Sequence, residues 1–194
     1  MKLKICGIKS IEDVYNINEA GGVDYGGFVF APHPLAVSKD TASRLRSVLD
    51  PAIKSVGVFV DESQEFVEEL VSTKIIDMVQ FHGDKEYGIS CPAIRAYRMR
   101  TTDDIVPTEC EFVLFDAYKA GERGSTGGMF DWRLLAAYNN DKPYFLAGGI
   151  NISNIADAVM LNPKPYCIDI SSGVKDASGA ICKNKIIQIR RYLS

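Results

Sequence analysis

Short runs of apolar, strand-favouring residues recur along the whole chain, separated by polar turns and by segments with helical periodicity. Eight runs have this character, at residues 2–6, 25–30, 55–60, 78–81, 94–99, 112–116, 144–149 and 166–171. Because each run is short, apolar and bounded by turn residues, the pattern predicts eight buried strands.

Segments with helical periodicity follow most of these strands, at residues 10–20, 38–49, 61–72, 131–138, 152–161 and 183–193. Side chains able to cap exposed helical N–H groups mark the starts, namely Ser10, Ser38, Asp61 or Ser63, Asp131 and Ser153. The connections after the fourth and fifth strands look short or irregular, so we expect no long helix there.

The alternation of strands and helices favours a parallel sheet, and eight such units on one short chain favour closure into a barrel. The predicted fold class is therefore α/β, a compact (β/α)8 TIM barrel with short loops, formed by a single domain at residues 1–194. An open doubly wound sheet is the competing architecture. No G-x-G-x-x-G motif follows the first strand, which argues against dinucleotide binding in such a sheet.

Composition narrows the class of protein and its partners. The chain has 46% hydrophobic and 24% charged residues and a net charge of −3, as expected of a soluble globular protein. It lacks the excess positive charge of nucleic-acid-binding proteins, and it has no apolar run of the roughly 20 residues that cross a bilayer. The N-terminus has no pattern of a signal peptide. We expect a cytoplasmic monomer or homodimer that binds neither nucleic acid nor membranes.

The cysteines and histidines argue against a metal or redox centre. The five cysteines are Cys6, Cys91, Cys110, Cys167 and Cys182. They are widely spaced and form no C-x-x-C pair, and there are only two histidines. We expect free thiols, no metal and no cofactor.

If the barrel is correct, functional residues should gather at the carboxyl ends of its strands. Cys6 ends the first strand, and the alternation of strand residues places Lys4 and Cys6 inside the barrel, with Lys4 one layer beneath the thiol. A nearby ammonium lowers the pKa of a thiol toward neutrality, as a general base requires. The alternative for Cys6 is a small buried residue.

Acidic and imidazole groups occur at the same predicted end. Asp116 occupies an inward-facing position on the sixth strand. Apolar surroundings would raise the pKa of its carboxyl enough for it to act as an acid. Its alternative role is to cap or pair within the loop. Asp169 points inward beside the first strand, with Lys4 as its expected partner in a mainly structural role, and we also expect both residues to contact the substrate. His82 would contact a ligand or hydrogen-bond within its loop.

Glycine and serine after the last two strands predict a phosphate site. Gly148 and Gly149 follow the seventh strand, and Ser171, Ser172 and Gly173 follow the eighth. Glycine lets backbone N–H groups approach an anion, serine adds hydroxyl donors, and these two loops hold phosphate in many barrels. A third glycine-rich loop that contains Gly127 could close over the same group.

The chain also resembles a known family through short motifs in a fixed order. They are KICGI at 4–8, FVFAP at 28–32, VGVFV at 56–60, VQFHG at 79–83, LFD at 114–116, STGGMFDW at 125–132, LAGGI at 146–150 and DISSGV at 169–174. Together they are similar to the phosphoribosylanthranilate isomerases of tryptophan biosynthesis. This resemblance implies a cofactor-free Amadori rearrangement of N-(5-phosphoribosyl)anthranilate, with Cys6 as the base, Asp116 as the acid, and the Gly148–Gly149 and Ser171–Gly173 loops on the phosphate.

One position departs from the family pattern. Family members usually carry an arginine after the second strand that faces the anthranilate carboxylate, whereas this chain has Leu35. Our hypothesis is that Arg123 or His33 replaces it as a substrate contact. The departure leaves two alternatives open. One is a barrel isomerase acting on another aminoaldose phosphate, such as the histidine-pathway intermediate, although such enzymes typically pair two aspartates. The other is an inactive barrel that only binds a phosphorylated ligand.

Overall fold

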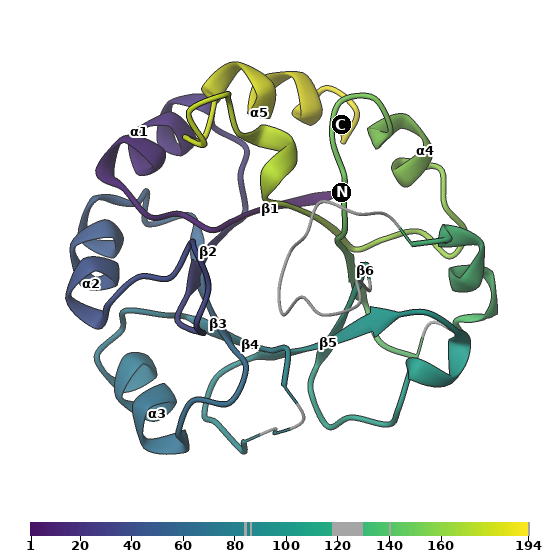
Figure 1. The fold of residues 1–194 in the computed structure, drawn as a ribbon, viewed down its shortest axis with the longest axis horizontal. Coiled ribbons are helices and arrows are strands. Elements are labelled where there is room, and N and C mark those ends of the chain that lie inside the picture. Colours follow the sequence, from purple (N-terminus) through teal and green to yellow (C-terminus); the bar gives the residue numbers. More distant parts are fainter. Residues whose placement is uncertain (84, 86, 118–129, 140, 194) are drawn as a thin grey trace.

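The protein folds as a closed barrel of parallel strands with helices around it (Figure 1). The computed structural model describes residues 1–83, 85, 87–117, 130–139 and 141–193. Each strand pairs with the next in sequence, and β8 pairs with β1 to close the barrel. The predicted (β/α)8 barrel is confirmed, and the open sheet is excluded.

The strands are short, as their apolar runs predicted. They are β1 (Lys2–Cys6), β2 (Tyr25–Val29), β3 (Lys54–Phe59), β4 (Met78–Phe81), β5 (Ala93–Met99), β6 (Phe112–Ala117), β7 (Tyr144–Leu146) and β8 (Cys167–Ile170). All eight predicted strands are therefore present, with β7 ending three residues earlier than expected.

The helices are α1 (Ile11–Ala20), α2 (Lys39–Val48), α3 (Gln64–Ser72), α4 (Ile155–Val159) and α5 (Lys183–Arg190), with 3-10 turns η1 (Thr102–Asp104), η2 (Trp132–Ala137) and η3 (Ser172–Val174). Ser10, Ser38 and Ser63 cap the first three helices by accepting backbone N–H bonds. No helix occurs among the described residues between β4 and β5, and only η1 follows β5, so the expectation of irregular connections there is confirmed.

Two predicted helices are shorter or tighter than expected. Residues 131–138 form the 3-10 helix η2, in which the carboxylate of Asp131 accepts from the backbone N–H of Arg133. In residues 152–161 only the five residues of α4 are α-helical. Asn154 precedes α4, and its side-chain amide is held by the backbone of Asn151 and Gly149, so the chain enters this helix from a turn. The expected cap, Ser153, instead hydrogen-bonds to Asn151.

The two faces of each strand have separate environments. On β1, Leu3 and Ile5 face outward into the large hydrophobic core beneath the helices. A second, smaller cluster fills the barrel interior and includes Val56, Ile94 and Leu114. The inward-facing residues of a strand therefore belong to this interior cluster, and those at its carboxyl end reach the surface.

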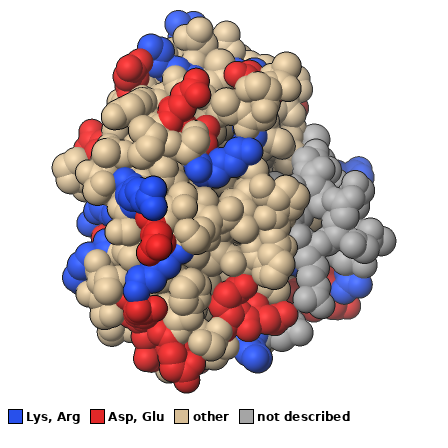
Figure 2. All heavy atoms as spheres, turned by 60° about the vertical axis from the view of Figure 1, so that its left-hand side comes forward, with Lys and Arg blue, Asp and Glu red and all other residues tan. Residues whose placement is uncertain are grey.

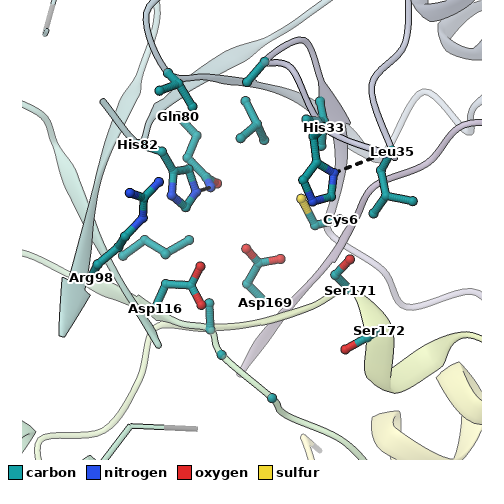
Figure 3. Close-up of a pocket in the computed structure, with 18 of the residues that line it drawn as sticks. Cys6, His33, Leu35, Gln80, His82, Arg98, Asp116, Asp169, Ser171 and Ser172 are labelled. Atoms are coloured by element: carbon teal, nitrogen blue, oxygen red, sulfur yellow. Dashed lines mark hydrogen bonds between the residues drawn. The ribbon is translucent and has the colours of Figure 1, made fainter. Parts of the chain in front are cut away.

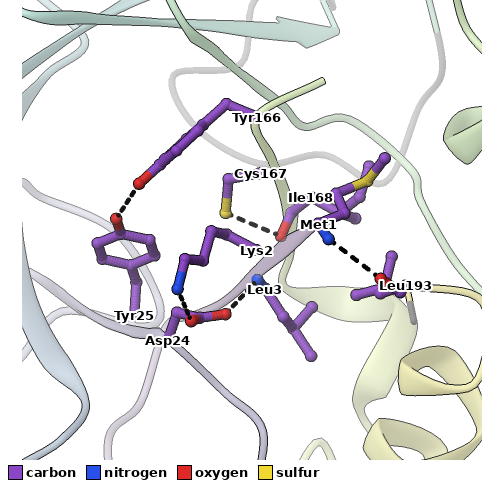
Figure 4. Close-up of polar contacts among 9 residues, drawn as sticks. All are labelled: Met1, Lys2, Leu3, Asp24, Tyr25, Tyr166, Cys167, Ile168 and Leu193. Atoms are coloured by element: carbon purple, nitrogen blue, oxygen red, sulfur yellow. Dashed lines mark hydrogen bonds and ion pairs between the residues drawn. The ribbon is translucent and has the colours of Figure 1, made fainter. Parts of the chain in front are cut away.

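Polar contacts tie together the amino-terminal end of the barrel (Figure 4). The carboxylate of Asp24 accepts from Lys2 Nζ at 2.7 Å and from the backbone N–H of Leu3 at 2.9 Å. The hydroxyls of Tyr25 and Tyr166 lie 2.9 Å apart. These contacts join β1, β2 and β8 at the end opposite to the pocket described below, where a barrel usually carries stability rather than chemistry.

The surface carries charges of both signs. On the face drawn in Figure 2, acidic and basic side chains are interspersed among uncharged residues. Among the described residues, no helix combines the length and apolar character that a membrane crossing needs.

Candidate active site

A pocket opens at the carboxyl ends of the strands, where the barrel fold was expected to place its chemistry (Figure 3). Its polar wall includes Cys6, Gln80, His82, Arg98, Asp116, Asp169, Ser171 and Ser172. Its apolar wall includes Val29, Val58, Val60 and Leu114. Side chains from β1, β4, β5, β6 and β8 thus meet in one site.

Cys6 lies in this pocket because β2 leaves space for its side chain. Gly27 pairs with Cys6 across the two strands, and a Cβ atom at Gly27 would come within 2.8 Å of Cys6 Sγ. Burial raises the pKa of the thiol above its usual value, and Lys4 offsets that rise only in part. The expectation that Lys4 would lower the thiol pKa toward neutrality is therefore wrong, because desolvation outweighs the attraction of the ammonium.

Lys4 and Asp169 form a buried ion pair beneath the thiol. The two residues are register partners on β1 and β8, and Lys4 Nζ lies 2.8 Å from Asp169 Oδ2. Although burial opposes it, the attraction of Asp169 and Cys6 raises the pKa of Lys4, so its ammonium stays charged. The expected pairing is confirmed. Lys4 itself is fully buried and does not line the pocket, which corrects our expectation of a direct substrate contact.

The second oxygen of Asp169 has a different environment. Asp169 Oδ1 is buried and has no hydrogen-bond partner among the described residues. Asp169 also lines the pocket, near Cys6. Its carboxylate therefore combines one oxygen held by Lys4 with one acceptor left for a bound molecule.

Asp116 stands on another wall of the pocket, at the end of β6. Its side chain is only 5% exposed. Burial raises the pKa of this carboxyl to about 6, even though its Oδ1 accepts the backbone N–H of Ala117 at 2.8 Å. A carboxyl that is partly protonated near neutral pH can donate a proton, so the structure agrees with the expected direction of the shift.

His82 is held as a neutral imidazole. The amide nitrogen of Gln80 donates to His82 Nε2 at 2.6 Å, which places the ring proton on Nδ1. Burial, with a contribution from the positive charge of Arg98, lowers the pKa of His82 to about 3. Nδ1 is buried and has no partner among the described residues, so this N–H is available to a ligand.

The loop after β2 contributes His33 and Leu35. The backbone N–H of Leu35 donates to His33 Nδ1 at 3.1 Å. Burial, followed by the charge of Lys175, lowers the pKa of His33, so this ring is neutral at neutral pH. Both residues line the pocket, but neither supplies a positive charge there.

Arg98 is a pocket residue that our sequence reasoning missed. It pairs in register with Asp116 across β5 and β6, and it follows Ile94 and Ala96 on the inward face of β5. The strand's alternation alone could have found it, since residues 94, 96 and 98 share one face.

The glycine and serine residues predicted to hold phosphate are brought together. Gly148 and Gly149 have φ values of 85° and 66°, which glycine adopts readily. Gly173 approaches the loop after β7 so closely that a Cβ atom there would lie 2.0 Å from the backbone oxygen of Ile150. Ser171 and Ser172 are near this contact and line the pocket.

Two predicted site residues, Arg123 and Gly127, lie outside the described residues. The five cysteines are free thiols, as expected. Within the described part of the chain, no group of three or more His, Cys, Asp or Glu side chains could hold a metal ion.

Comparison with known proteins identifies one family over nearly the whole chain. Residues 3–191 match the family model described as N-(5'phosphoribosyl)anthranilate (PRA) isomerase. A protein named N-(5'-phosphoribosyl)anthranilate isomerase from Endomicrobium trichonymphae is 44% identical over 201 residues, covering 99% of this chain and 98% of the relative.

Solved structures agree with this match. The phosphoribosyl anthranilate isomerase of Thermus thermophilus aligns with a TM-score of 0.84 at 26% identity, covering 100% of this chain and 98% of that one. A phosphoribosyl anthranilate isomerase in complex with reduced 1-(o-carboxyphenylamino)-1-deoxyribulose 5-phosphate aligns with a TM-score of 0.82 at 28% identity, covering 100% and 98%. The chain therefore belongs to the N-(5'-phosphoribosyl)anthranilate isomerase family.

Proposed function

We propose that this chain isomerises N-(5'-phosphoribosyl)anthranilate to 1-(2-carboxyphenylamino)-1-deoxyribulose 5-phosphate, a step of tryptophan biosynthesis. This Amadori rearrangement needs an acid for the furanose ring oxygen and a base for the C2 proton, on different sides of the sugar. The observation that carries the proposal is that Asp116 and Cys6 project from β6 and β1 into one pocket.

Asp116 is the proposed general acid. With a pKa of about 6, its carboxyl keeps a useful protonated fraction near neutral pH, whereas an ordinary aspartate is almost fully ionised. Transfer of this proton to the ring oxygen breaks the bond between that oxygen and C1. The product of the step is an open-chain Schiff base of the anthranilate nitrogen with C1.

Cys6 is the proposed general base. Its thiolate removes the C2 proton of the Schiff base, and the electron pair moves toward the nitrogen to give an enolamine, which tautomerises to the ketone. Because burial raises the thiol pKa, only a minor thiolate fraction is active in the free enzyme. No cofactor is needed, since the substrate's own imine accepts the electrons.

The substrate phosphate is proposed to bind between the loops after β7 and β8. Ser171 and Ser172 offer hydroxyl donors, and the positive φ of Gly148 and Gly149 shapes the backbone around the same side of the pocket. Gly173 supports this arrangement by allowing the two loops to meet. Gly127 remains a predicted contact.

Asp169 is proposed to accept a hydrogen bond from a sugar hydroxyl through its unpartnered Oδ1, while Lys4 holds its other oxygen. His82 and His33 are proposed contacts of the anthranilate ring region, and Arg123 stays a prediction. We also expect the chain to act as one domain in the cytoplasm, as a monomer or homodimer and without nucleic acid.

The direct test is turnover of freshly formed N-(5'-phosphoribosyl)anthranilate by purified protein, followed as loss of its fluorescence. Wild-type protein should turn it over, and Asp116→Asn should lose at least about 10²-fold in kcat, since a positioned general acid is worth roughly 10²- to 10⁴-fold. No turnover by folded wild-type protein would refute the proposed activity. Equal activity of the variant would remove Asp116 from the mechanism.

A further inference from the structure

Arg98 is the only lysine or arginine among the described residues that line the pocket. It comes from β5, one residue before that strand ends, rather than from a loop, and β5 places residues 94, 96 and 98 on its inner face. Its position beside Asp116 on the neighbouring strand fixes it at the height of the catalytic groups. A cation in this position needs an explanation.

One nitrogen of the Arg98 guanidinium lacks a hydrogen-bond partner among the described residues. Its Nη2 is buried and has no hydrogen-bond partner among the described residues. Arg95, on the other face of the same strand, instead donates from Nη1 to the backbone oxygen of Gly83 at 2.5 Å. A buried donor left unpaired destabilises a fold, and one that lies in a pocket can be satisfied by an acceptor bound there.

A second donor lies beside it. Arg98 and His82 are neighbours in the pocket (Figure 3), and Nδ1 of His82 is also buried and unpartnered among the described residues. Because Gln80 donates to the other ring nitrogen, Nδ1 carries the proton. Two N–H donors from β5 and the end of β4 therefore face the pocket without acceptors.

The proposed substrate carries an anion that matches these donors. It has a phosphate at one end and the carboxylate of its aromatic amine at the other. The serines of the proposed phosphate site lie on the opposite side of the pocket from Arg98 and His82 (Figure 3). The apolar side chains of Val58, Val60 and Leu114 line the pocket and offer surface to an aromatic ring. Leu35 has no charge to offer a carboxylate.

We propose that Arg98, together with Nδ1 of His82, binds the carboxylate of the anthranilate ring and makes the enzyme selective for a carboxylated arylamine. The inference rests on the proposed function, whose substrate supplies the carboxylate. Selectivity follows because an arylamine without the carboxylate would leave both buried donors unpaired, and sites built around such donors reject analogues that lack the acceptor.

The test compares two reduced product analogues that differ only in the carboxylate: 1-(2-carboxyphenylamino)- and 1-phenylamino-1-deoxyribitol 5-phosphate. Their Kd values are measured by calorimetry at one salt concentration. Wild-type protein should bind the carboxylated analogue roughly 10- to 100-fold more tightly, the range expected for hydrogen bonds to a charged group. A difference below about threefold in the wild type would overturn the proposal without any variant.

Arg98→Met keeps an unbranched, flexible side chain, shorter than that of arginine, and removes its charge. It should weaken binding of the carboxylated analogue by roughly 10- to 100-fold and change that of the phenylamino analogue by less than about threefold. Arg100→Met, an exposed arginine one residue past the end of β5, is the matched control and should leave both Kd values unchanged. Equal weakening of both analogues would assign Arg98 a structural role and overturn the inference.

Arg98→Lys covers the case in which the methionine variant does not fold, because it keeps the positive charge. It loses the forked geometry that suits a carboxylate, so we expect a threefold to tenfold loss for the carboxylated analogue alone. An unchanged ratio of the two Kd values would place the carboxylate elsewhere. Failure of this inference is distinct from failure of the proposed activity, which turnover by the wild type decides separately.

Discussion

The carboxyl of Asp116 should make the folded protein less stable at neutral pH than it would be with a neutral side chain. The group is almost fully buried, and its pKa of about 6 compares with an ordinary value of 3.8. A shift of about two pH units corresponds to about 3 kcal/mol. Because the folded state binds this proton more tightly than the unfolded state does, the group lowers stability as pH rises from about 4 to about 6, and the cost stays constant above that.

Asp116→Asn removes the charge while keeping the shape, and its Oδ1 can still accept the backbone N–H of Ala117. We therefore expect the variant to be more stable than wild type by about 3 kcal/mol at pH 7.5 and by almost nothing at pH 4. For a protein of 194 residues this corresponds to a rise in Tm of roughly 6–12 °C at neutral pH. The same variant should be catalytically impaired, as a functional group held at a cost in stability implies.

The assay is reversible urea unfolding of both proteins at half-unit intervals from pH 4 to 8, followed by circular dichroism and by the fluorescence of the single tryptophan, Trp132. The difference in unfolding free energy between the proteins cancels the titration of all other groups. Asp103→Asn, at an exposed aspartate, is the control and should change the unfolding free energy by less than about 0.5 kcal/mol. A difference that does not vary with pH, or an Asn variant less stable at pH 7.5, would refute the reasoning.

Three further outcomes follow from the site. The value of kcat/KM should fall below about pH 6, where Asp116 titrates, and stay level above it until the thiol of Cys6 titrates above its usual range. The reason is that the active form of the enzyme holds one proton between the acid and the base. Stopped-flow assays that show no fall in kcat/KM near pH 6 would contradict this. Cys6→Ser should lose roughly 10²- to 10⁴-fold in kcat, while the inhibition constant of the product stays within about threefold of its wild-type value. A normal kcat would show that Cys6 is not the base. Gly27→Ala should displace the thiol, since the new Cβ would lie 2.8 Å from Sγ, and lower kcat at least about tenfold with folding intact; unchanged kinetics would show that the site tolerates the shift.

Most of the barrel could be predicted from the sequence because alternate residues of a strand face opposite sides of the sheet. The same parity placed Lys4, Cys6, Asp116 and Asp169 inside, and the closed strand order then made Lys4 and Asp169 neighbours across 165 residues. Arg98 was not predicted, although it also faces inward. Arg98 lies within β5 and not in the loop after it, where functional residues were expected, although the alternation of the strand predicts its inward position.

Other features depend on three-dimensional burial, which neighbouring residues in the sequence do not reveal. Lys4 is visible two positions from Cys6, but the desolvation that raises the thiol pKa comes from the whole pocket. The short α4 similarly results from side-chain contacts of Asn154 with the backbone of the preceding loop, which compete with a helical start at Ser153. The close approach of Gly173 to Ile150 likewise appears only once the loops after β7 and β8 are built.

The neighbouring positions of Arg98 and Asp116 connect substrate recognition with acid catalysis. Burial raises the pKa of Asp116, whereas the positive charge of Arg98 opposes that rise in the free enzyme. A substrate carboxylate bound to Arg98 would neutralise this charge and exclude water from the same wall, and both changes favour the protonated carboxyl. It follows that the acid becomes more completely protonated once a carboxylated substrate is in place. An arginine held on a strand is suited to this coupling, because the hydrogen bonds between β5 and β6 fix its distance from the acid. A cation on the loop that carries Leu35 would not be held at a fixed distance in this way.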